Sequence, residues 1–184
     1  MPLKPLLIGE KLRLTTFKSS DAPIIATWQQ DNTFLRLMDA IPAYPKTEDQ
    51  LKAWIESIPA QTRDYTFAIR LIENDALLGW VELDGIMWNN RVSGISIAIG
   101  DTKQRGKGYG AEAMQLVLGF AFNELNLHRI QLTVFAYNAQ AIKLYEQLGF
   151  QKEGVYREFL ERDGKRHDMI LYGLLRHEWQ AQQP

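Results

Sequence analysis

Glycine occupies three alternate positions near the middle of the chain, and two cations accompany it. Glycine allows left-handed backbone conformations and a close approach of the chain to a ligand. If a helix begins here, its unpaired N–H groups and the positive end of its dipole would attract an anion. A tandem phosphate suits this segment best, and a flexible, solvated turn is the alternative. The residues are Arg105, Gly106, Lys107, Gly108 and Gly110.

The spacing of these glycines excludes two well-known phosphate loops. The Walker pattern needs Lys and then Ser or Thr after its last glycine, and the dinucleotide fingerprint needs Gly-x-Gly-x-x-Gly. This chain has Gly-x-Gly-x-Gly instead. The surrounding elements must therefore decide between a phosphate site and a plain turn.

The flanking segments predict a strand, a helix and a second strand. Residues 93–100 and 128–136 are rich in β-branched and apolar residues, and residues 109–124 repeat apolar side chains at helical spacing up to a stop at Asn126. We expect the two strands to be parallel neighbours joined by a right-handed crossover. The glycine turn then lies where the first strand ends and the helix begins.

The remaining segments complete a mixed α/β pattern in which two hairpins and three further helices are expected. Ser20 or Asp21 would cap the first helix, and Thr47 with Gln50 has the spacing of a capping box. No repeat or linker interrupts the chain, so we expect one domain over residues 8–178. Predicted strands cover residues 11–17, 65–72, 77–85, 154–164 and 167–175, and predicted helices cover residues 20–28, 46–58 and 138–149.

Composition narrows the function further. The 184 residues are 46% hydrophobic and 23% charged with a formal net charge of -1, which argues against a nucleic-acid-binding surface. The absence of cysteine excludes disulfides, a thiolate nucleophile and thiolate metal sites, and three scattered histidines offer no ligand pair. No apolar run approaches about 20 residues, so no membrane span is expected. The sequence predicts a cytoplasmic protein with metal-free chemistry.

Two motifs resemble those of the GNAT family of N-acetyltransferases. Arg105, Gly108 and Gly110 match its Arg/Gln-x-x-Gly-x-Gly/Ala pyrophosphate motif, and "NAQAIKLYEQLGF" is similar to its Asn-x-x-Ala-x-x-x-Tyr-x-x-x-Gly-Phe segment. The resemblance covers residues 11–175, and its C-terminal layout looks like the branch of ribosomal-protein N-terminal and spermidine acetyltransferases. In the second motif the matching residues are Asn138, Ala141, Tyr145, Gly149 and Phe150.

The resemblance implies a mostly antiparallel seven-stranded sheet with flanking helices, in which two central parallel strands splay apart around acetyl-CoA. Here those strands would be residues 94–99 and 129–135. Asn138 would bond the pantetheine or cysteamine end, unless it is only a helix cap. Backbone groups of Ile97, Ala98 and Ile99, otherwise plain core, would pair with the pantetheine arm. N–H groups of Arg105, Gly106, Lys107, Gly108, Tyr109 and Gly110 would hold the pyrophosphate.

The same resemblance implies an N-acetyltransferase in which the amine attacks acetyl-CoA directly in a ternary complex. Tyr145 would donate to the departing thiolate, and a strand N–H near Ile97 would donate to the oxyanion. With a tyrosine near pKa 10 and a thiol near 8.5, full proton transfer is modestly uphill, although a hydrogen bond still lowers the barrier. An aromatic side chain on the core face of a helix is the alternative for Tyr145.

The base is where this chain departs from its relatives, because Gly94 stands where many carry a glutamate. Glu82 is the first candidate to replace it, and Asp84, Glu158 and Glu161 are the others; Glu82 and Asp84 could equally be solvated surface groups. The missing carboxylate also raises a second hypothesis, a CoA-binding sensor or scaffold without turnover.

The nature of the base bears on the acceptor. A terminal α-amine with a pKa near 8 is partly neutral at pH 7, whereas a polyamine or lysine near 10.4 costs about 4–5 kcal/mol to deprotonate. We therefore expect a protein or peptide N-terminus, with a polyamine or other small amine as the alternative. The first helices and loops would select this acceptor, with Phe34, Tyr44 and Trp88 as candidate lining. A homodimer is left open.

Overall fold

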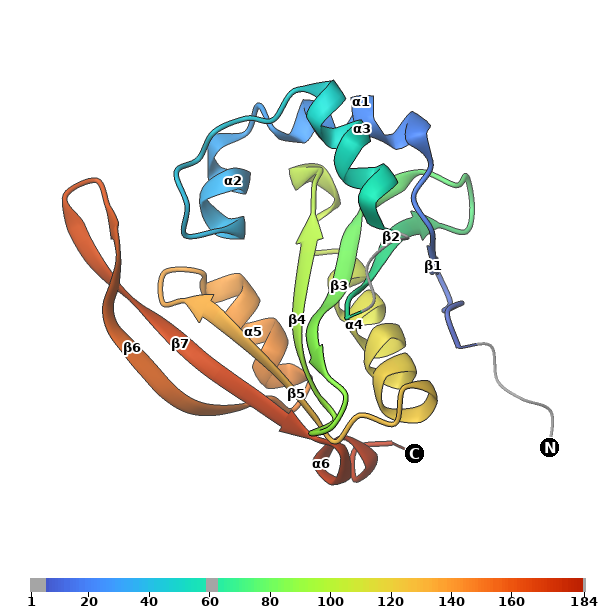
Figure 1. The fold of residues 1–184 in the computed structure, drawn as a ribbon, viewed down its shortest axis with the longest axis vertical. Coiled ribbons are helices and arrows are strands. Elements are labelled where there is room, and N and C mark those ends of the chain that lie inside the picture. Colours follow the sequence, from blue (N-terminus) through green and yellow to red (C-terminus); the bar gives the residue numbers. More distant parts are fainter. Residues whose placement is uncertain (1–5, 59–62, 184) are drawn as a thin grey trace.

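The computed structural model describes residues 6–58 and 63–183, and within them seven strands form one sheet in the order β1-β2-β3-β4-β5-β7-β6 (Figure 1). Every neighbouring pair is antiparallel except β4 and β5, which are parallel. This confirms the expected mixed sheet. The strands are β1 (Leu12–Thr15), β2 (Tyr65–Leu71), β3 (Leu77–Met87), β4 (Val92–Ile99), β5 (Arg129–Phe135), β6 (Gln151–Arg162) and β7 (Lys165–Leu175).

The parallel strands β4 and β5 pair only at their first residues. Their last rung joins Gly94 to Gln131, and beyond it β4 runs on to Ile99 and β5 to Phe135 with no further pairing between them. In Figure 1 the two strands share a lower end and separate upward. The splayed central pair expected over residues 94–99 and 129–135 is confirmed.

Helices cover both faces of this sheet. Side chains alternate across a strand, and Trp80 and Val81 accordingly belong to two different hydrophobic clusters. Trp80 packs with α1 and α3, whereas Val81 packs with α4 and α5. None of the described helices is long and apolar enough to cross a membrane. The helices are η1 (Ser19–Asp21), α1 (Ala22–Trp28), α2 (Asn32–Met38), α3 (Glu48–Ser57), η3 (Thr102–Gln104), α4 (Tyr109–Gly119), η4 (Phe120–Glu124), α5 (Ala139–Gln147) and α6 (Arg176–Gln180).

Local sequence signals account for several helix ends. Thr47 and Gln50 form the predicted capping box of α3, with bonds of 3.3 Å and 2.9 Å to each other's backbone N–H groups. Asn126 and Gly149 follow helical segments with φ of 52° and 86°, the left-handed conformation that ends a helix. The predicted stops at both residues are therefore confirmed.

Other details differ from the expectations. The helix expected over residues 109–124 ends in a π-helical turn, η4, in which the Leu125 N–H donates to the Phe120 carbonyl at 3.1 Å. Neither Ser20 nor Asp21 caps α1 with its side chain. Asp21 instead forms a buried ion pair with Arg70 at 2.5 Å, a contact between distant segments that no local pattern reveals. The helices α2 and α6 were not predicted.

Candidate active site

The glycine turn between β4 and α4 has the backbone that an anion site requires. Gly106 and Gly108 have φ of 74° and 88°, and a Cβ at either position would meet nothing within 4 Å. Glycine is needed at both for conformation rather than for space. Gly110 has another role, because a Cβ there would lie 3.6 Å from Leu144 of α5 and 4.0 Å from Ile97 of β4. It marks the point where α4, α5 and β4 meet.

The turn presents a row of free N–H groups. Within residues 6–58 and 63–183, the N–H groups of residues 106–111 have no hydrogen-bond acceptor, and the first helical bond runs from Glu112 to the Gly108 carbonyl at 3.1 Å. The Arg105 N–H differs from the prediction, since it already donates to the Thr102 carbonyl at 3.2 Å. Six N–H groups at a helix N-terminus fit the oxygens of a diphosphate.

The Arg105 side chain is held by contacts within the protein and is not free at the rim of the turn. Its Nε and Nη2 donate to the Ile99 carbonyl at 3.2 Å and 3.1 Å, and its guanidinium lies 5.9 Å from the centre of the Phe34 ring. Arg105 thus ties the glycine turn to the end of β4 and to α2. Lys107 is exposed at the rim of the turn, where its Nζ donates to Gln104 at 2.9 Å.

The register of β4 determines which of its peptide groups face the gap that opens between β4 and β5 beyond Gly94. The Gly100 N–H donates to Leu78 of β3, whereas the Arg91 carbonyl accepts from Arg129 at the start of β5. By alternation, the peptide groups of Ile97 and Ile99 face β5, where no rung pairs them. Those of Ala98 face Trp80 on β3. The expectation that Ala98 also pairs with a ligand therefore does not fit the register.

Tyr145 lies on α5 with its ring in the core. It is 7% exposed and packs edge-on against Phe150 at 5.9 Å. Its hydroxyl has no hydrogen-bond partner among the described residues. Burial raises the pKa of Tyr145 to about 12, so the phenol stays protonated near neutral pH. The structure thus makes Tyr145 a hydrogen-bond donor, and full proton transfer to sulfur is more uphill than from an unperturbed ring.

Asn138 follows β5 and begins α5. Its Oδ1 accepts from the Ala141 N–H at 3.2 Å, which makes it the N-cap of the helix. The helix-cap interpretation is therefore confirmed. Its side-chain amide N–H groups have no acceptor in the described part of the chain, so the predicted bond to a ligand stays a prediction.

Glu82 lies on the face of β3 that carries Trp80, toward α1 and α3. Its carboxylate accepts from Thr66 Oγ1 at 3.1 Å and lines a cavity of about 190 Å³. Burial raises the pKa of Glu82, and the nearby charges of Asp84 and Asp64 raise it further, against the opposing effect of the Thr66 bond. Glu82 is therefore partly desolvated, as a proton acceptor should be.

Asp84 lies one step farther along the same face, directly over Gly94. The two residues are partners in the β3–β4 register, and a Cβ on Gly94 would lie 1.8 Å from Asp84 Oδ1. Partial desolvation against the strand raises the pKa of Asp84, and the charge of Asp64 adds to the effect. The place that lacks a carboxylate on β4 is thus occupied by one from β3.

The other two candidate carboxylates are exposed on the β6–β7 hairpin. Glu161 pairs with Arg166 at 3.0 Å, and both side chains are 55% exposed. Glu158 has φ of 52° within a bulge of β6, and its N–H donates to Asp168 at 2.8 Å. Neither lines the cavity at Glu82.

The cavity at Glu82 is mostly apolar and is closed by the segment after α2. Tyr44 lines it as expected, but Phe34 is core at 2% exposure and Trp88 is 45% exposed on the β3–β4 turn. Most of the lining lies in the first helices and loops, the region that the sequence indicated, but apart from Tyr44 and Glu82 its individual side chains were not identified, because they meet through packing between separate segments. Other residues of the lining are Ile25, Gln29, Leu35, Asp39, Leu51, Trp54 and Trp80.

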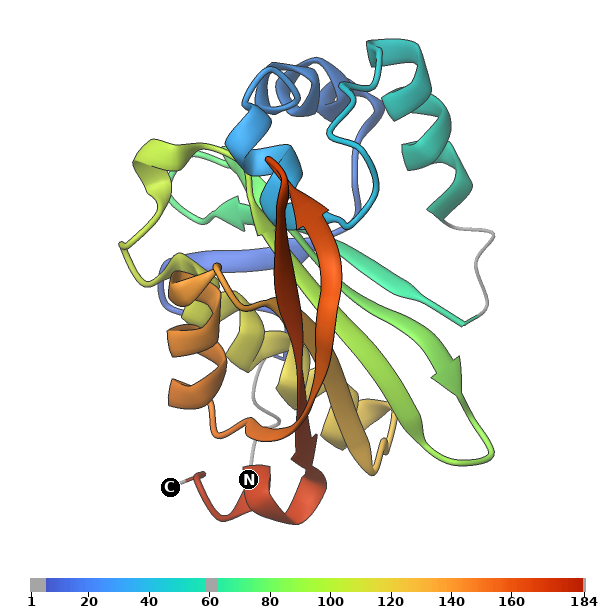
Figure 2. The same ribbon diagram turned by 90° about the vertical axis from the view of Figure 1, so that its left-hand side faces the viewer.

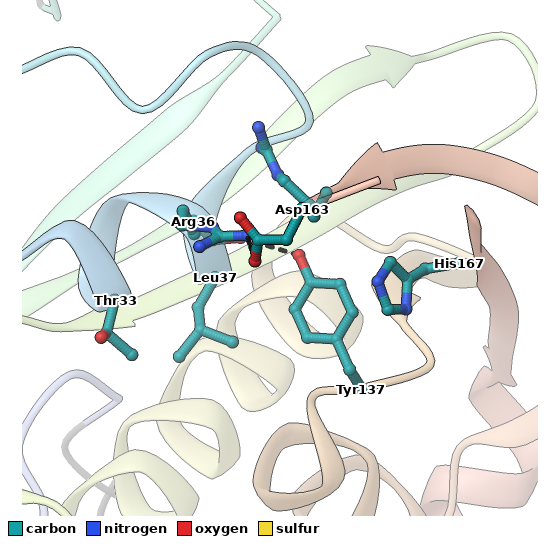
Figure 3. Close-up of a pocket in the computed structure, with 7 residues that line it drawn as sticks. Thr33, Arg36, Leu37, Tyr137, Asp163 and His167 are labelled. Atoms are coloured by element: carbon teal, nitrogen blue, oxygen red, sulfur yellow. Dashed lines mark hydrogen bonds and ion pairs between the residues drawn. The ribbon is translucent and has the colours of Figure 1, made fainter. Parts of the chain in front are cut away.

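The tip of the β6–β7 hairpin is fastened to α2 beside a second cavity of about 280 Å³. Figure 3 shows Arg36 of α2 in contact with Asp163 of the tip, at 2.6 Å, and Tyr137 directed at the Arg36 backbone. Arg162 Nη2 donates to the carbonyls of Asp39 and Ile41 at 3.0 Å each. The hairpin thus holds the segment that closes the cavity at Glu82.

The chemistry of the site is that of an anion-holding turn, an edge of free peptide groups, a protonated phenol, the half-buried carboxylate of Glu82 and the exposed carboxylate of Asp84. No group of three or more His, Cys, Asp or Glu side chains in residues 6–58 and 63–183 is placed to hold a metal ion.

Comparison with known proteins gives consistent results. A model of the acetyltransferase (GNAT) domain matches residues 11–151. The SPbeta prophage-derived uncharacterized N-acetyltransferase YokL of Bacillus subtilis is 31% identical over 173 residues, covering 94% of each chain. The putative ribosomal N-acetyltransferase YdaF of the same species is 30% identical over 112 residues, 61% of each chain. The structure of spermidine N-acetyltransferase from Vibrio cholerae in complex with CoA and spermine has a TM-score of 0.83 at 25% identity, covering 92% of this chain and 98% of that one.

Proposed function

Because the chain belongs to the GNAT family of acetyltransferases, we propose an acceptor and a role for each residue of the site from that premise. The protein is an N-acetyltransferase that uses acetyl-CoA. We propose that its acceptor is the α-amine at the N-terminus of a protein or peptide. The catalytic unit would span residues 8–178.

We assign the cofactor-binding roles to the backbone groups that have no partner within the described residues. The N–H groups of residues 106–111 would hold the pyrophosphate, with Lys107 at the rim. The peptide groups of Ile97 and the N–H of Ile99 would pair with the pantetheine arm, since the Ile99 carbonyl already accepts from Arg105. Asn138 would bond the arm from the end of β5. Arg105 contributes by fixing the turn rather than by reaching the phosphates.

The reaction needs three groups besides the bound substrates. The amine nitrogen attacks the thioester carbonyl, the carbon–sulfur bond breaks, and the amine proton passes to Glu82, directly or through a water. The Ile97 N–H would donate to the oxyanion, and Tyr145 would donate a hydrogen bond to the departing thiolate. The unpartnered, protonated phenol of Tyr145 supports this role.

The residues that line the cavity at Glu82 are the observation that favours a protein or peptide N-terminus as the acceptor. Leu51, Trp54 and Trp80 offer an apolar slot beside a carboxylate, and Lys46 also lines the cavity. A first side chain with an apolar body fits there, whereas the further cations of a polyamine would meet Lys46 as well as the carboxylates of Glu82 and Asp39. The name of the relative YdaF, a putative ribosomal N-acetyltransferase, points in the same direction.

An acceptor screen tests the proposal. Purified protein and acetyl-CoA are mixed with peptides that differ only in their first residue, with their N-terminally blocked forms, and with spermidine and spermine, and release of CoA thiol is recorded. We expect turnover with free N-termini, faster for an apolar first residue, and none with blocked peptides. Turnover confined to spermidine or spermine would overturn the α-amine proposal.

A polyamine acceptor is the second candidate, for a specific reason. Two carboxylates on one face of β3, the half-buried Glu82 and the exposed Asp84, can hold a protonated amine, which weakens the argument that the chain lacks a base for amines of high pKa. The structure similar at a TM-score of 0.83 is that of a spermidine N-acetyltransferase. In the same screen this candidate predicts that spermidine outcompetes every peptide.

A further inference from the structure

If the proposed function holds, the two substrates would meet where β4 and β5 are last paired, at Gly94 and Gln131. The turn at residues 106–111 lies beyond Ile99, at the open end. An arm that pairs with Ile99 and then with Ile97 runs toward the last rung, which joins Gly94 to Gln131. The reacting end of acetyl-CoA is therefore expected near Gly94.

The side chain that occupies the space over Gly94 is Asp84. An added Cβ would lie 1.8 Å from its Oδ1 and 2.9 Å from its Cγ, so the carboxylate lies across the glycine backbone. Asp84 and Glu82 are two residues apart on one strand, which places them on the same face about 7 Å apart. The absence of a side chain at Gly94 is what admits the carboxylate to this position.

The carboxylate of Asp84 is also available. Among the described residues neither of its oxygens accepts a hydrogen bond, whereas Glu82 accepts from Thr66 and Asp64 accepts from the Gly85 N–H at 2.6 Å. A carboxylate that served only to stabilise the β3–β4 pair would be expected to bond a donor of that pair. Asp84 instead is exposed to solvent and bonds no donor, and its pKa is raised by partial desolvation against the strand and by the charge of Asp64.

We propose that Asp84 is a second catalytic carboxylate, which binds the ammonium group of the acceptor over Gly94 and holds the nitrogen beside the thioester while Glu82 takes the proton. One N–H bond of the ammonium breaks as the Glu82 O–H bond forms, and the freed lone pair attacks the carbonyl. As the carbon–sulfur bond breaks, a second N–H proton passes to the departing thiolate, which leaves as the thiol, and the third N–H donates to Asp84 throughout. Two carboxylates on β3 thus divide the work that a single base would do.

Moving the carboxylate from one strand to the other tests this proposal. Every atom that would meet an added Cβ on Gly94 at less than 3 Å belongs to the Asp84 side chain, and the next is the Asp84 carbonyl oxygen at 3.4 Å. The double variant Asp84→Gly with Gly94→Asp can therefore place a carboxylate from β4 in the same space. The single variants Asp84→Asn and Asp84→Gly remove it.

Steady-state thiol release is measured with the best acceptor of the screen, peptide or polyamine. We expect Asp84→Asn and Asp84→Gly to raise the acceptor KM and to lower kcat/KM by about 10²–10³-fold, with the acetyl-CoA KM within about threefold of wild type. The double variant should recover at least about tenfold over Asp84→Gly. Gly94→Ala, which pushes the carboxylate aside, should resemble Asp84→Asn.

Two results would overturn the role of Asp84. One is a kcat/KM for Asp84→Asn within about twofold of wild type; the other is a double variant that binds acetyl-CoA normally yet gains nothing over Asp84→Gly. Both leave the acetyltransferase activity of the wild type intact, so they are distinct from a failure of the proposed function. Wild-type protein without turnover on any acceptor would overturn both proposals.

Discussion

At the scale of single residues, Tyr145 combines two properties that a structural tyrosine rarely has together. Its ring is fully packed in the core, yet its hydroxyl has no partner in the described part of the chain. The fully buried side-chain nitrogen and oxygen atoms without a partner in the described residues are Arg13 Nε and Arg162 Nε, and the Tyr145 hydroxyl is not one of them. Solvent therefore reaches this hydroxyl at the end of a packed ring, where it is free to donate to a ligand, and a departing thiolate is the ligand proposed here.

Replacing Tyr145 with Phe should lower kcat without harming the fold. A hydrogen bond to a charged group contributes about 1.5–3 kcal/mol, so kcat should fall about 10- to 150-fold. The acetyl-CoA KM and the melting temperature should stay near those of wild type, because no protein partner loses its bond. Steady-state kinetics and thermal unfolding measure the three quantities.

Tyr172→Phe is the matched control for this change. Tyr172 is equally buried, but its hydroxyl donates to Glu146 at 2.8 Å. Its removal should cost about 1–2 kcal/mol of stability and leave kcat unchanged. If Tyr145→Phe kept kcat within twofold, or if both variants behaved alike, the thiolate donor would have to be sought elsewhere.

The raised pKa of Tyr145 also predicts how stability depends on pH. Its pKa is about 12 in the folded protein and about 10 in an unfolded chain. Between pH 10 and 12 the folded state binds more protons, so this contribution to stability is fully present below pH 10 and is lost as pH rises, by at most about 1.4 kcal/mol per pH unit. Urea unfolding from pH 9 to 11 should therefore show a shallower decline for Tyr145→Phe than for wild type. Equal slopes would contradict it.

At the scale of elements, glycine serves two different purposes in the turn between β4 and α4. Gly108 needs its left-handed φ of 88°, whereas Gly110 needs only a small side chain at the junction of α4 with α5 and β4. A Cβ at Gly108 would meet no neighbour, so its cost is purely conformational. The predicted phosphate site depends on that conformation, since it aims the N–H groups.

Gly108→Ala should therefore weaken acetyl-CoA binding more than Gly110→Ala does. A non-glycine residue in the left-handed region costs about 1–2 kcal/mol, so a turn that relaxes to avoid this strain would lose roughly tenfold in affinity. Alanine at Gly110 makes contacts of 3.6 Å and 4.0 Å, which are ordinary, and should leave affinity within about threefold. Calorimetric titration with CoA measures both. Equal losses would mean that the free N–H groups of the turn do not hold the pyrophosphate.

Elements with local signals could be predicted from the sequence, and contacts between distant segments could not. The capping box at Thr47 and the stop at Gly149 are encoded within a few residues. The short helix α2 also had such a signal, since Asp31 accepts from the Thr33 N–H at 2.8 Å. The position of Asp84 over Gly94 depends on the register of two strands, which alternation alone does not fix.

The difference between local signals and long-range contacts also applies to the residues of the candidate site. Arg105, Gly108 and Gly110 were identified because their spacing is local, but the attachment of Arg105 to Ile99 and Phe34 comes from the packing of α2 against the end of β4. Likewise, the free edge excludes Ala98 only because β3 pairs with it. Local patterns thus indicate candidate residues, whereas which of their atoms are free depends on tertiary contacts.

At the scale of the whole molecule, the cavity at Glu82, where we propose that the acceptor binds, is shaped by both the N-terminal and the C-terminal parts of the chain. Figure 2 shows the β6–β7 hairpin rising across the sheet to reach α2 in the N-terminal helical layer. Residues more than 120 apart in sequence join there, including the pair of Arg36 and Asp163. The shape of the cavity at Glu82 thus depends on the contact between the hairpin tip and the loop after α2, rather than on either segment alone.

Arg162 is the residue through which this contact would reach the acceptor. Its Nη2 donates to the carbonyls of Asp39 and Ile41, both of which line the cavity at Glu82. Arg162→Ala should therefore raise the acceptor KM about 3- to 10-fold and cost about 1–2 kcal/mol of stability, while the acetyl-CoA KM stays constant because the glycine turn is elsewhere. Kinetics with each substrate varied in turn, and urea unfolding, measure these effects.

Arg166→Ala provides the comparison, because Arg166 also lies on the hairpin. Among the acidic side chains of the described residues, it pairs with the exposed Glu161 alone. An exposed ion pair contributes at most about 1 kcal/mol, and this one touches no residue of the cavity. Its acceptor KM should match that of wild type. An equal rise in acceptor KM for both variants would mean that the charge of the hairpin, rather than the hydrogen bonds of Arg162 to the loop, affects acceptor binding. A rise for Arg162→Ala alone would mean that β6 and β7 help to determine which acceptor the enzyme binds.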